Sequence, residues 1–187
     1  MAKILVVVDM QKDFINGSLG TKEAEAIVPR VKNIIDEYVN TDDAKILFTK
    51  DTHHENYLNT SEGKNLPVVH CVEGTDGWQI PDELLENIDL QNLQLFRDVI
   101  VVSKPTFGFQ FIDRCIREFF GLDDSYIDEI RIVGLCTDIC VVSNALILKA
   151  AFPEVPIVVD SSACAGVTPE KHEAALEVMR SCQINVI

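Results

Sequence analysis

The chain has 187 residues, of which 30 are acidic and 16 basic, so its formal net charge is −14 at pH 7. This length predicts one domain, spanning residues 1–187. Hydrophobic residues make up 47% of the chain and charged residues 25%, a balance that supports a buried core and excludes a disordered chain. The negative charge argues against nucleic-acid binding and against anionic membrane surfaces, because both would repel the protein.

The N-terminal apolar stretch predicts a strand rather than a targeting segment. It meets Asp9 at once and has no small-residue cleavage site, and no apolar run reaches the about 20 residues of a membrane span. Most of the cysteines sit in apolar or helical contexts, so we expect reduced thiols and a cytoplasmic protein. We interpret four of them as packing residues: Cys71, Cys115, Cys164 and Cys182.

Apolar, β-branched runs alternate with amphipathic stretches along the chain. Residues 3–9 form the first predicted strand, in which the positions between Lys3 and Asp9 are all apolar, as in a strand buried on both faces of a parallel sheet. Residues 24–39 carry apolar side chains at three- and four-residue spacings, which predicts a helix. Further strands are predicted at 44–49, 99–103, 129–135, 156–160 and 184–187. Further helices are predicted at 81–88, 109–120 and 139–151, and a last one opens at Thr168 and Pro169, a favoured N-cap and first helical residue.

This alternation predicts an α/β fold: a three-layer αβα arrangement around a doubly wound, six-stranded parallel sheet of the Rossmann-like kind. Residues 51–77 show no clear period and contain three of the four histidines, and a loop of that length is usually functional. Ligands in such folds bind outside the carboxyl ends of the strands, so the residues that follow each apolar run are the candidates for a site.

Three reactive side chains stand at such positions: Asp9, Lys104 and Cys140. Taken singly, Asp9 could cap a turn, Lys104 could be a solvated charge and Cys140 a small buried hydrophobe. Together they make chemical sense, because a thiolate attacks a carbonyl, a carboxylate moves the proton and an ammonium stabilises both charges. Cys140 begins a predicted helix, so we expect backbone amides and a nearby lysine to lower the pKa of its thiol. We interpret His172, on the last helix, as a solvated surface residue.

A second group of polar side chains lies in the long loop. Asp51, His53 and His70 offer one carboxylate and two imidazoles, which suit Zn²⁺, Fe²⁺ or Mn²⁺. Glu62 is either a further ligand or a loop charge, and His54 is expected at the surface. The alternative, that these are merely polar residues of a solvated loop, stays open at this point.

In order and spacing, these residues resemble the nicotinamidase branch of the isochorismatase-like cysteine hydrolases, over nearly the whole chain. The markers are Asp9-Met10-Gln11-Lys12-Asp13-Phe14, Asp51-x-His53, Leu66-Pro67-x-x-His70-Cys71, Lys104, and Gly134-x-x-Thr137-Asp138-x-Cys140-Val141.

The resemblance implies roles for these residues. Asp9, Lys104 and Cys140 would be the catalytic triad, and the amides of Cys136 and Cys140 would form an oxyanion hole, with a cis peptide before Cys136. Phe14 would line the pocket against a pyridine ring. The implied metal ligands are Asp51, His53, His70 and Glu62, with zinc the commonest metal.

The implied function is metal-dependent hydrolysis of nicotinamide to nicotinate and ammonia through a cysteine thioester, a reaction of NAD salvage. The expected partners are a small-molecule amide and further copies of the chain in a homo-oligomer. The alternative is an amidohydrolase of the same family for another small amide or a carbamoyl compound, with a vestigial metal set. A non-catalytic metal-binding or scaffold protein is a further alternative, against which the complete triad argues. The run Pro105-Thr106-Phe107-Gly108-Phe109 departs from the Tyr-Ser pair common after this lysine, which affects the pocket wall.

Overall fold

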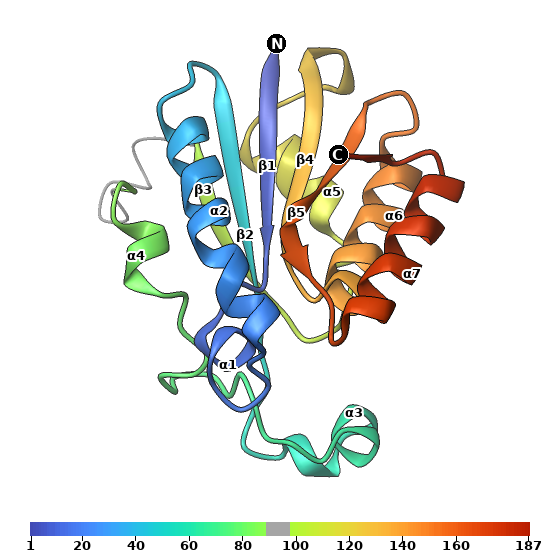
Figure 1. Ribbon diagram of the computed structural model, residues 1–187. Coiled ribbons are helices and arrows are strands. Elements are labelled where there is room, and N and C mark those ends of the chain that lie inside the picture. Colours follow the sequence, from blue (N-terminus) through green and yellow to red (C-terminus); the bar gives the residue numbers. More distant parts are fainter. Residues whose placement is uncertain (89–97) are drawn as a thin grey trace.

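A computed structural model describes residues 1–88 and 98–187 of the chain. Within this part six parallel strands form one sheet in the order β3-β2-β1-β4-β5-β6, with helices on both faces (Figure 1). The predicted αβα architecture is therefore confirmed. The strands are β1 (Ala2–Val8), β2 (Ala44–Asp51), β3 (Val99–Lys104), β4 (Ile127–Leu135), β5 (Ile157–Ala165) and β6 (Asn185–Val186).

The helices divide between the two faces of the sheet. The principal helices are α1 (Lys12–Ile15), α2 (Lys22–Val39), α3 (Ser61–Asn65), α4 (Asp82–Leu85), α5 (Ile112–Arg114), α6 (Val142–Ala151) and α7 (Pro169–Ser181). Two π-helical turns, η2 (Cys115–Phe119) and η4 (Thr137–Val141), and two 3₁₀ turns, η1 (Tyr57–Asn59) and η3 (Asp124–Tyr126), complete the set. One core layer joins α2 and α4 to the sheet, and the other joins α5, α6 and α7 to its opposite face.

The central strand β1 shows why its sequence is apolar from Ile4 to Val8. Leu5 and Val7 pack in the α2 layer, whereas Ile4, Val6 and Val8 pack in the opposite layer, and all five are fully buried. A strand with helices on both faces has no solvent side, so polar alternation is absent.

The predicted elements differ from the structure in several places. Strand β5 runs to Ala165, beyond the predicted end at Asp160, because the register shifts after Val159 and pairing with β4 resumes at Cys164. The last strand has two residues instead of four. Helix α1 was not predicted, since four residues are too few to show a helical period, and the loop 51–77 contains η1 and α3.

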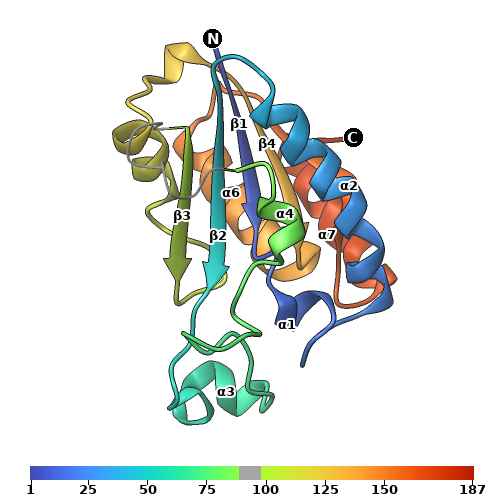
Figure 2. The same cartoon turned by 90° about the vertical axis from the view of Figure 1, so that its left-hand side faces the viewer.

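The carboxyl ends of the strands lie at the same edge of the sheet, with the segment that carries α3 below the ends of β2 and β3 (Figure 2). The strand order reverses between β1 and β4, and this is the switch point at which α/β sheets bind ligands. In the described part of the chain we find no helix with the length and apolar character of a membrane span.

Candidate active site and metal centre

Three side chains from distant segments meet at the carboxyl edge of the sheet. Asp9 follows β1, Lys104 ends β3, and Cys140 lies in η4 after β4. The Nζ atom of Lys104 lies 2.7 Å from Oδ2 of Asp9 and 3.5 Å from Sγ of Cys140. Asp9 and Lys104 are fully buried and Cys140 is 5% exposed. The structure thus brings together the three reactive groups that the sequence singled out.

The local backbone explains why these groups can approach one another. Asp9 has a left-handed φ of 47°, which turns the chain sharply as β1 ends, and Thr49 Oγ1 donates a 2.7 Å hydrogen bond to Asp9 Oδ1. Gly134 has a φ of 120°, and a Cβ atom there would lie 2.1 Å from the carbonyl oxygen of Val8. Only glycine therefore lets the end of β4 pack this closely against β1.

The electrostatics of the group follow from burial and from the single ammonium. Burial raises the pKa of Asp9, an effect that the charge of Lys104 opposes. Burial alone would lower the pKa of Lys104, but the facing charges of Asp9 and Asp51 outweigh it and raise the pKa. The lysine therefore stays protonated beside the Asp9 carboxyl.

The expected low pKa of the Cys140 thiol is wrong for this structure. Burial and the adjacent Asp9 charge raise the pKa of Cys140 well above the ordinary value, and Lys104 only partly offsets them. A lone cation cannot replace the water lost around the sulfur while a carboxylate lies beside it. Cys140 is thus a neutral thiol that needs a base. The buried Asp9 carboxylate, which contacts the same ammonium as the Cys140 sulfur, can be that base.

The turn that carries Cys140 is held from several sides. The peptide bond before Cys136 is cis, as the resemblance implied. Thr137 Oγ1 lies 2.8 Å from Nδ1 of His172, so His172 is not the solvated surface residue that we expected. The fully buried Asn144 donates to the carbonyl oxygen of Cys140 and, through its own oxygen, accepts from the amide of Phe109.

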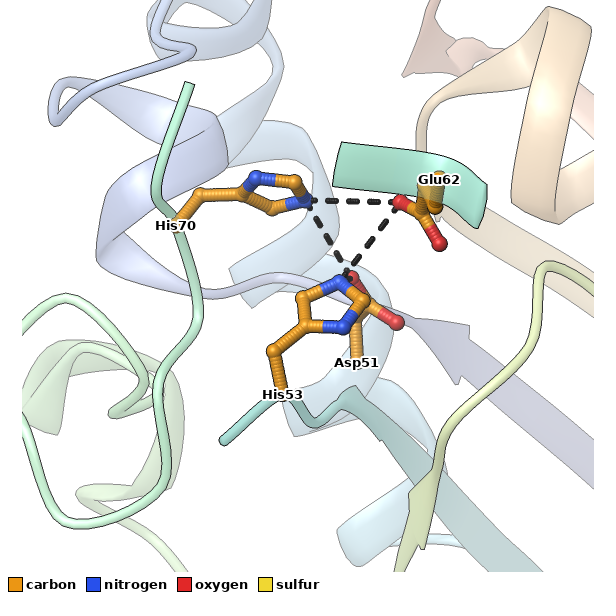
Figure 3. A group of neighbouring side chains, drawn as sticks. All are labelled: Asp51, His53, Glu62 and His70. Atoms are coloured by element: carbon orange, nitrogen blue, oxygen red, sulfur yellow. Dashed lines mark ion pairs between the residues drawn. The ribbon is translucent and has the colours of Figure 1, made fainter. Parts of the chain in front are cut away.

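Four potential metal ligands converge beside this group (Figure 3). Nε2 of His53 lies 2.9 Å from Oδ2 of Asp51, and Nε2 of His70 lies 3.5 Å from the same oxygen. Oε1 of Glu62, on α3, lies 3.6 Å from the His53 nitrogen and 3.8 Å from that of His70. All four ligand atoms are within 4.8 Å of one another. His54 is exposed and faces Glu73, as expected.

The donor set fits one divalent cation. Two carboxylates face two imidazoles, and Nε2 of the buried His53 faces Oδ2 of Asp51 and Oε1 of Glu62. Burial alone lowers the pKa of His53, but the hydrogen bonds and charges of Asp51 and Glu62 outweigh it and raise the pKa to about 9. Such a concentration of negative charge suits a bound cation, and carboxylate and imidazole ligands suit zinc, iron and manganese alike.

An apolar pocket of about 690 Å³ opens onto both groups. It is lined by the polar or reactive residues Asp51, Glu62, His70 and Cys140, and by the aromatic residues Phe14 and Phe107. The ring of Phe14 lies 5.4 Å from that of His70, centroid to centroid. A planar, apolar ring with one polar substituent suits a pocket of this kind. The other lining residues include Leu19, Thr21, Ala24, Leu135, Cys136, Ile139, Val167 and Lys171.

The sequence missed several residues that hold this site in shape. Gln11 and Asn144 are fully buried polar side chains that bond to the main chain of other segments. An amide in an apolar context is the only local signal, and it does not reveal the partner. Of the residues interpreted as packing, Cys71 and Cys164 are buried, whereas Cys182 is exposed and Cys115 half-buried.

The isochorismatase domain family matches residues 3–187, and the chain belongs to this family. Among solved structures, the nicotinamidase/pyrazinamidase of Bacillus subtilis is 25% identical to this chain, with a TM-score of 0.80. The match covers 100% of this chain and 99% of that one. The pyrazinamidase of Pyrococcus horikoshii, solved in complex with zinc, is 27% identical with a TM-score of 0.76; the match covers 99% of this chain and 98% of that one.

Curated relatives point to the same branch of the family. The nicotinamidase of Schizosaccharomyces pombe is 28% identical over 98% of this chain and 91% of its own length. The nicotinamidase/pyrazinamidase of Mycobacterium tuberculosis is 25% identical over 99% of this chain and 98% of its own length. Within its family the chain is therefore a nicotinamidase-like hydrolase of amide bonds.

Proposed function

We propose that this protein hydrolyses nicotinamide to nicotinate and ammonia, with Cys140 as nucleophile and a divalent metal held by Asp51, His53, Glu62 and His70. The observation that carries the proposal is the contact of Lys104 Nζ with both Asp9 and Cys140 Sγ, next to a four-ligand cluster in one pocket. An amidase that lacked the metal would have no use for that cluster. The reaction would belong to NAD salvage.

The first step is attack of Cys140 on the carboxamide carbon. Because burial keeps the thiol neutral, its proton passes to Asp9 as the S–C bond forms. The raised pKa of Asp9 makes it a stronger base than an ordinary carboxylate. Lys104 stays positively charged throughout and limits the energetic cost of the negative charge on Asp9 and Cys140.

The tetrahedral oxyanion would be bound by the amides of Cys136 and Cys140, in the turn after β4. One such donor typically contributes about 3 kcal/mol to the stability of the transition state. The C–N bond then breaks, and Asp9 returns its proton to the departing ammonia. A water molecule deprotonated by Asp9 attacks the thioester, the S–C bond breaks, and Cys140 regains its proton as nicotinate leaves.

The metal ligands and Phe14 would position the ring. A metal bound at this cluster would supply a Lewis acid for the pyridine nitrogen and so orient the substrate. Phe14 would pack against the ring and exclude water from that side. Zinc is the metal that we propose, in line with the zinc named for the Pyrococcus relative.

The decisive test is ammonia release from nicotinamide by the purified protein, before and after dialysis against a chelator. We expect turnover that the chelator removes and that added Zn²⁺, Fe²⁺ or Mn²⁺ restores. Metal content measured on the same samples connects activity to occupancy. Turnover that is unchanged in metal-free protein would refute the metal requirement.

The size of the pocket favours one alternative, a larger amide as the preferred substrate. A volume of about 690 Å³ is in the range that encloses drug-sized ligands, whereas nicotinamide is a single ring. The loop after Lys104, which places Phe107 in the pocket wall, departs from the common nicotinamidase pattern. Ammonia release from a panel of aromatic amides and carbamoyl compounds, compared by kcat/KM, separates the two candidates.

A further inference from the structure

Two polar residues of the Asp9–Phe14 segment, Gln11 and Asp13, have no part in the chemistry above. Both side chains bond to the main chain beside a metal ligand, although the ligands come from different segments. The four-residue helix α1 and the residue before it therefore connect two parts of the cluster that are 19 residues apart, Asp51 and His70.

The Gln11 side chain takes the place of a neighbouring strand beside the end of β2, beyond the point where β1 has ended. The last register pair of β1 and β2 is Val8 with Thr49, so Asp51 has no strand beside it on the β1 side. There the fully buried Gln11 accepts from the Asp51 amide at 2.7 Å and donates to the Asp51 carbonyl at 2.9 Å. The side-chain nitrogen of Gln11 also donates to the carbonyl oxygen of Trp78 at 2.9 Å.

Only a side chain with both a donor and an acceptor makes this pair of contacts. The amide and carbonyl of one strand residue point to the same side, and a carboxamide presents an oxygen and a nitrogen at matching positions. On the other side of β2, Lys104 of β3 pairs with Asp51 in the sheet register. Gln11 thus fixes the ligand-bearing end of β2 as a neighbouring strand would.

Asp13 acts on the segment that carries His70. Its Oδ2 atom accepts a 2.8 Å hydrogen bond from the amide of Cys71, which has a left-handed φ of 45°. A non-glycine residue in this conformation is held there by its surroundings. Gly77 is part of this arrangement, because a Cβ atom at that position would lie 2.2 Å from the Asp13 carboxylate.

The turn at Cys71, which Asp13 holds, orients the His70 ring. Nδ1 of His70 lies 2.8 Å from the carbonyl oxygen of Val68, which leaves Nε2 facing Asp51. The carbonyl of Cys71 accepts from the amide of His53, so the same turn also positions the second imidazole. Release of the Cys71 amide would therefore disturb both histidines.

We propose that Gln11 and Asp13 are positioning residues for a divalent metal site, Gln11 through Asp51 and Asp13 through His70 and His53. The inference rests on the metal-binding part of the proposed function and does not depend on which amide is hydrolysed. Partners of metal ligands typically contribute about 10- to 100-fold to metal affinity. In the described part of the chain no hydrogen bond joins either side chain to Cys140, so the reactivity of the thiol should be unaffected when they change.

The test is the affinity of chelator-treated protein for Zn²⁺ and Mn²⁺, measured by competition with a chromogenic chelator. We expect Gln11→Met, which keeps the shape and loses all three bonds, and Asp13→Leu to weaken binding about 10- to 100-fold. Asp13→Asn, which keeps an acceptor for the Cys71 amide, should stay within about threefold of wild type. Gln11→Glu replaces the donor with an acceptor that faces two carbonyls and should fail as Gln11→Met does.

Two further measurements separate positioning from general damage. The rate of Cys140 alkylation in metal-free protein should be the same in all four variants as in wild type. Asp160→Asn is the matched control, because it disrupts the ion pairs that the buried Asp160 makes with Arg30 and Arg131, away from α1 and the ligands. It should lower the urea midpoint without changing metal affinity.

Equal metal affinity in folded Gln11→Met and wild type would overturn the role of Gln11, and the same result in Asp13→Leu would overturn that of Asp13. Asp160→Asn binding metal as weakly as these variants would overturn both roles. If Gln11→Met does not fold, the decision falls to Gln11→Glu. A wild-type protein that binds no metal overturns this inference together with the proposed metal site. One that binds metal but leaves nicotinamide intact overturns only the substrate.

Discussion

The Asp9–Lys104–Cys140 group and the Asp51–His53–Glu62–His70 cluster are neighbours, since Lys104 Nζ lies 3.6 Å from Oδ1 of Asp51. The chain holds the two groups by different means. In the first group each residue ends or directly follows a strand of the sheet, or lies in the turn after it. In the second group only Asp51 lies on a strand, and the other three ligands lie in the segment between β2 and α4.

This difference indicates which substitutions each group is sensitive to. Strand register in a buried sheet is strongly specified, so the sheet itself brings the residues of the first group to one edge. The second group depends on hydrogen bonds that Gln11, just before α1, and Asp13, in α1, make to residues far along the chain. We therefore expect substitutions outside the cluster to disturb metal binding more readily than they disturb the three reactive groups.

The largest expected effect comes from removal of the nucleophile. Cys140→Ala should lower ammonia release by about 10⁴-fold or more, because no other group supplies the covalent step. Metal content should be unchanged, since Cys140 is not among the four ligands. Cys182→Ser, a change at an exposed cysteine, is the control and should keep full activity. Wild-type turnover by the Cys140→Ala protein would contradict the assignment.

Removal of the buried ammonium should be the largest effect on stability. Lys104→Met leaves the Asp9 and Asp51 carboxylates without their cation, and breaking a buried ion pair typically costs about 3–5 kcal/mol in the free energy of unfolding. Urea denaturation with chelator present measures this loss. The double variant Asp9→Asn/Lys104→Met should regain part of it, because the buried negative charge is then gone. No recovery would mean that the lysine acts through packing alone.

Removal of a ligand should affect the second group and spare the first. His53→Ala should weaken metal binding by at least about 100-fold, beyond the usual effect of a ligand's partner. It should also raise KM for nicotinamide, since the ring loses its anchor. Cys140 should still react with a thiol reagent at the wild-type rate in metal-free protein. His54→Ala, at the exposed neighbour, should bind metal normally. If both variants weaken binding equally, the cluster is not the metal site.

The smallest effect is a shift in the pH dependence of the thiol. Because burial and Asp9 raise the pKa of Cys140, its alkylation in metal-free protein should rise with a midpoint above the about 8.5 of a free thiol. The thiolate is the reactive form, so a raised pKa moves the curve to higher pH. Peptide mapping of alkylated protein follows Cys140 separately from the exposed Cys182. A midpoint below 8.5 would show that Lys104 outweighs burial.

Several features could be predicted from the residues alone. Consecutive apolar positions predicted strands buried on both faces, and their alternation with helices predicted the parallel sheet that the structure has. Parallel strands end at one edge of a sheet, so the sequence alone could place Asp9, Asp51 and Lys104 at that edge. The Asp51-x-His53 and His70 pattern indicated a metal cluster, and these residues do converge.

Other features depended on contacts between distant segments, which no local pattern encodes. The raised pKa of Cys140 follows from burial and from Asp9, whereas the sequence showed only a cysteine near a helix start and a lysine elsewhere. The bond between Thr137 and His172 has the same origin. Glu62 was left from the residues alone as either a ligand or a loop charge, and the fold places it in the cluster, as the resemblance implied. Periodicity and composition show which faces of a helix or strand are buried, so they determined the parallel sheet and the edge at which its strands end. The hydration and the hydrogen-bond partners of a side chain are set by the groups that pack against it. The tertiary structure alone therefore decided the protonation state of the Cys140 thiol and the hydrogen bonds that hold the metal ligands.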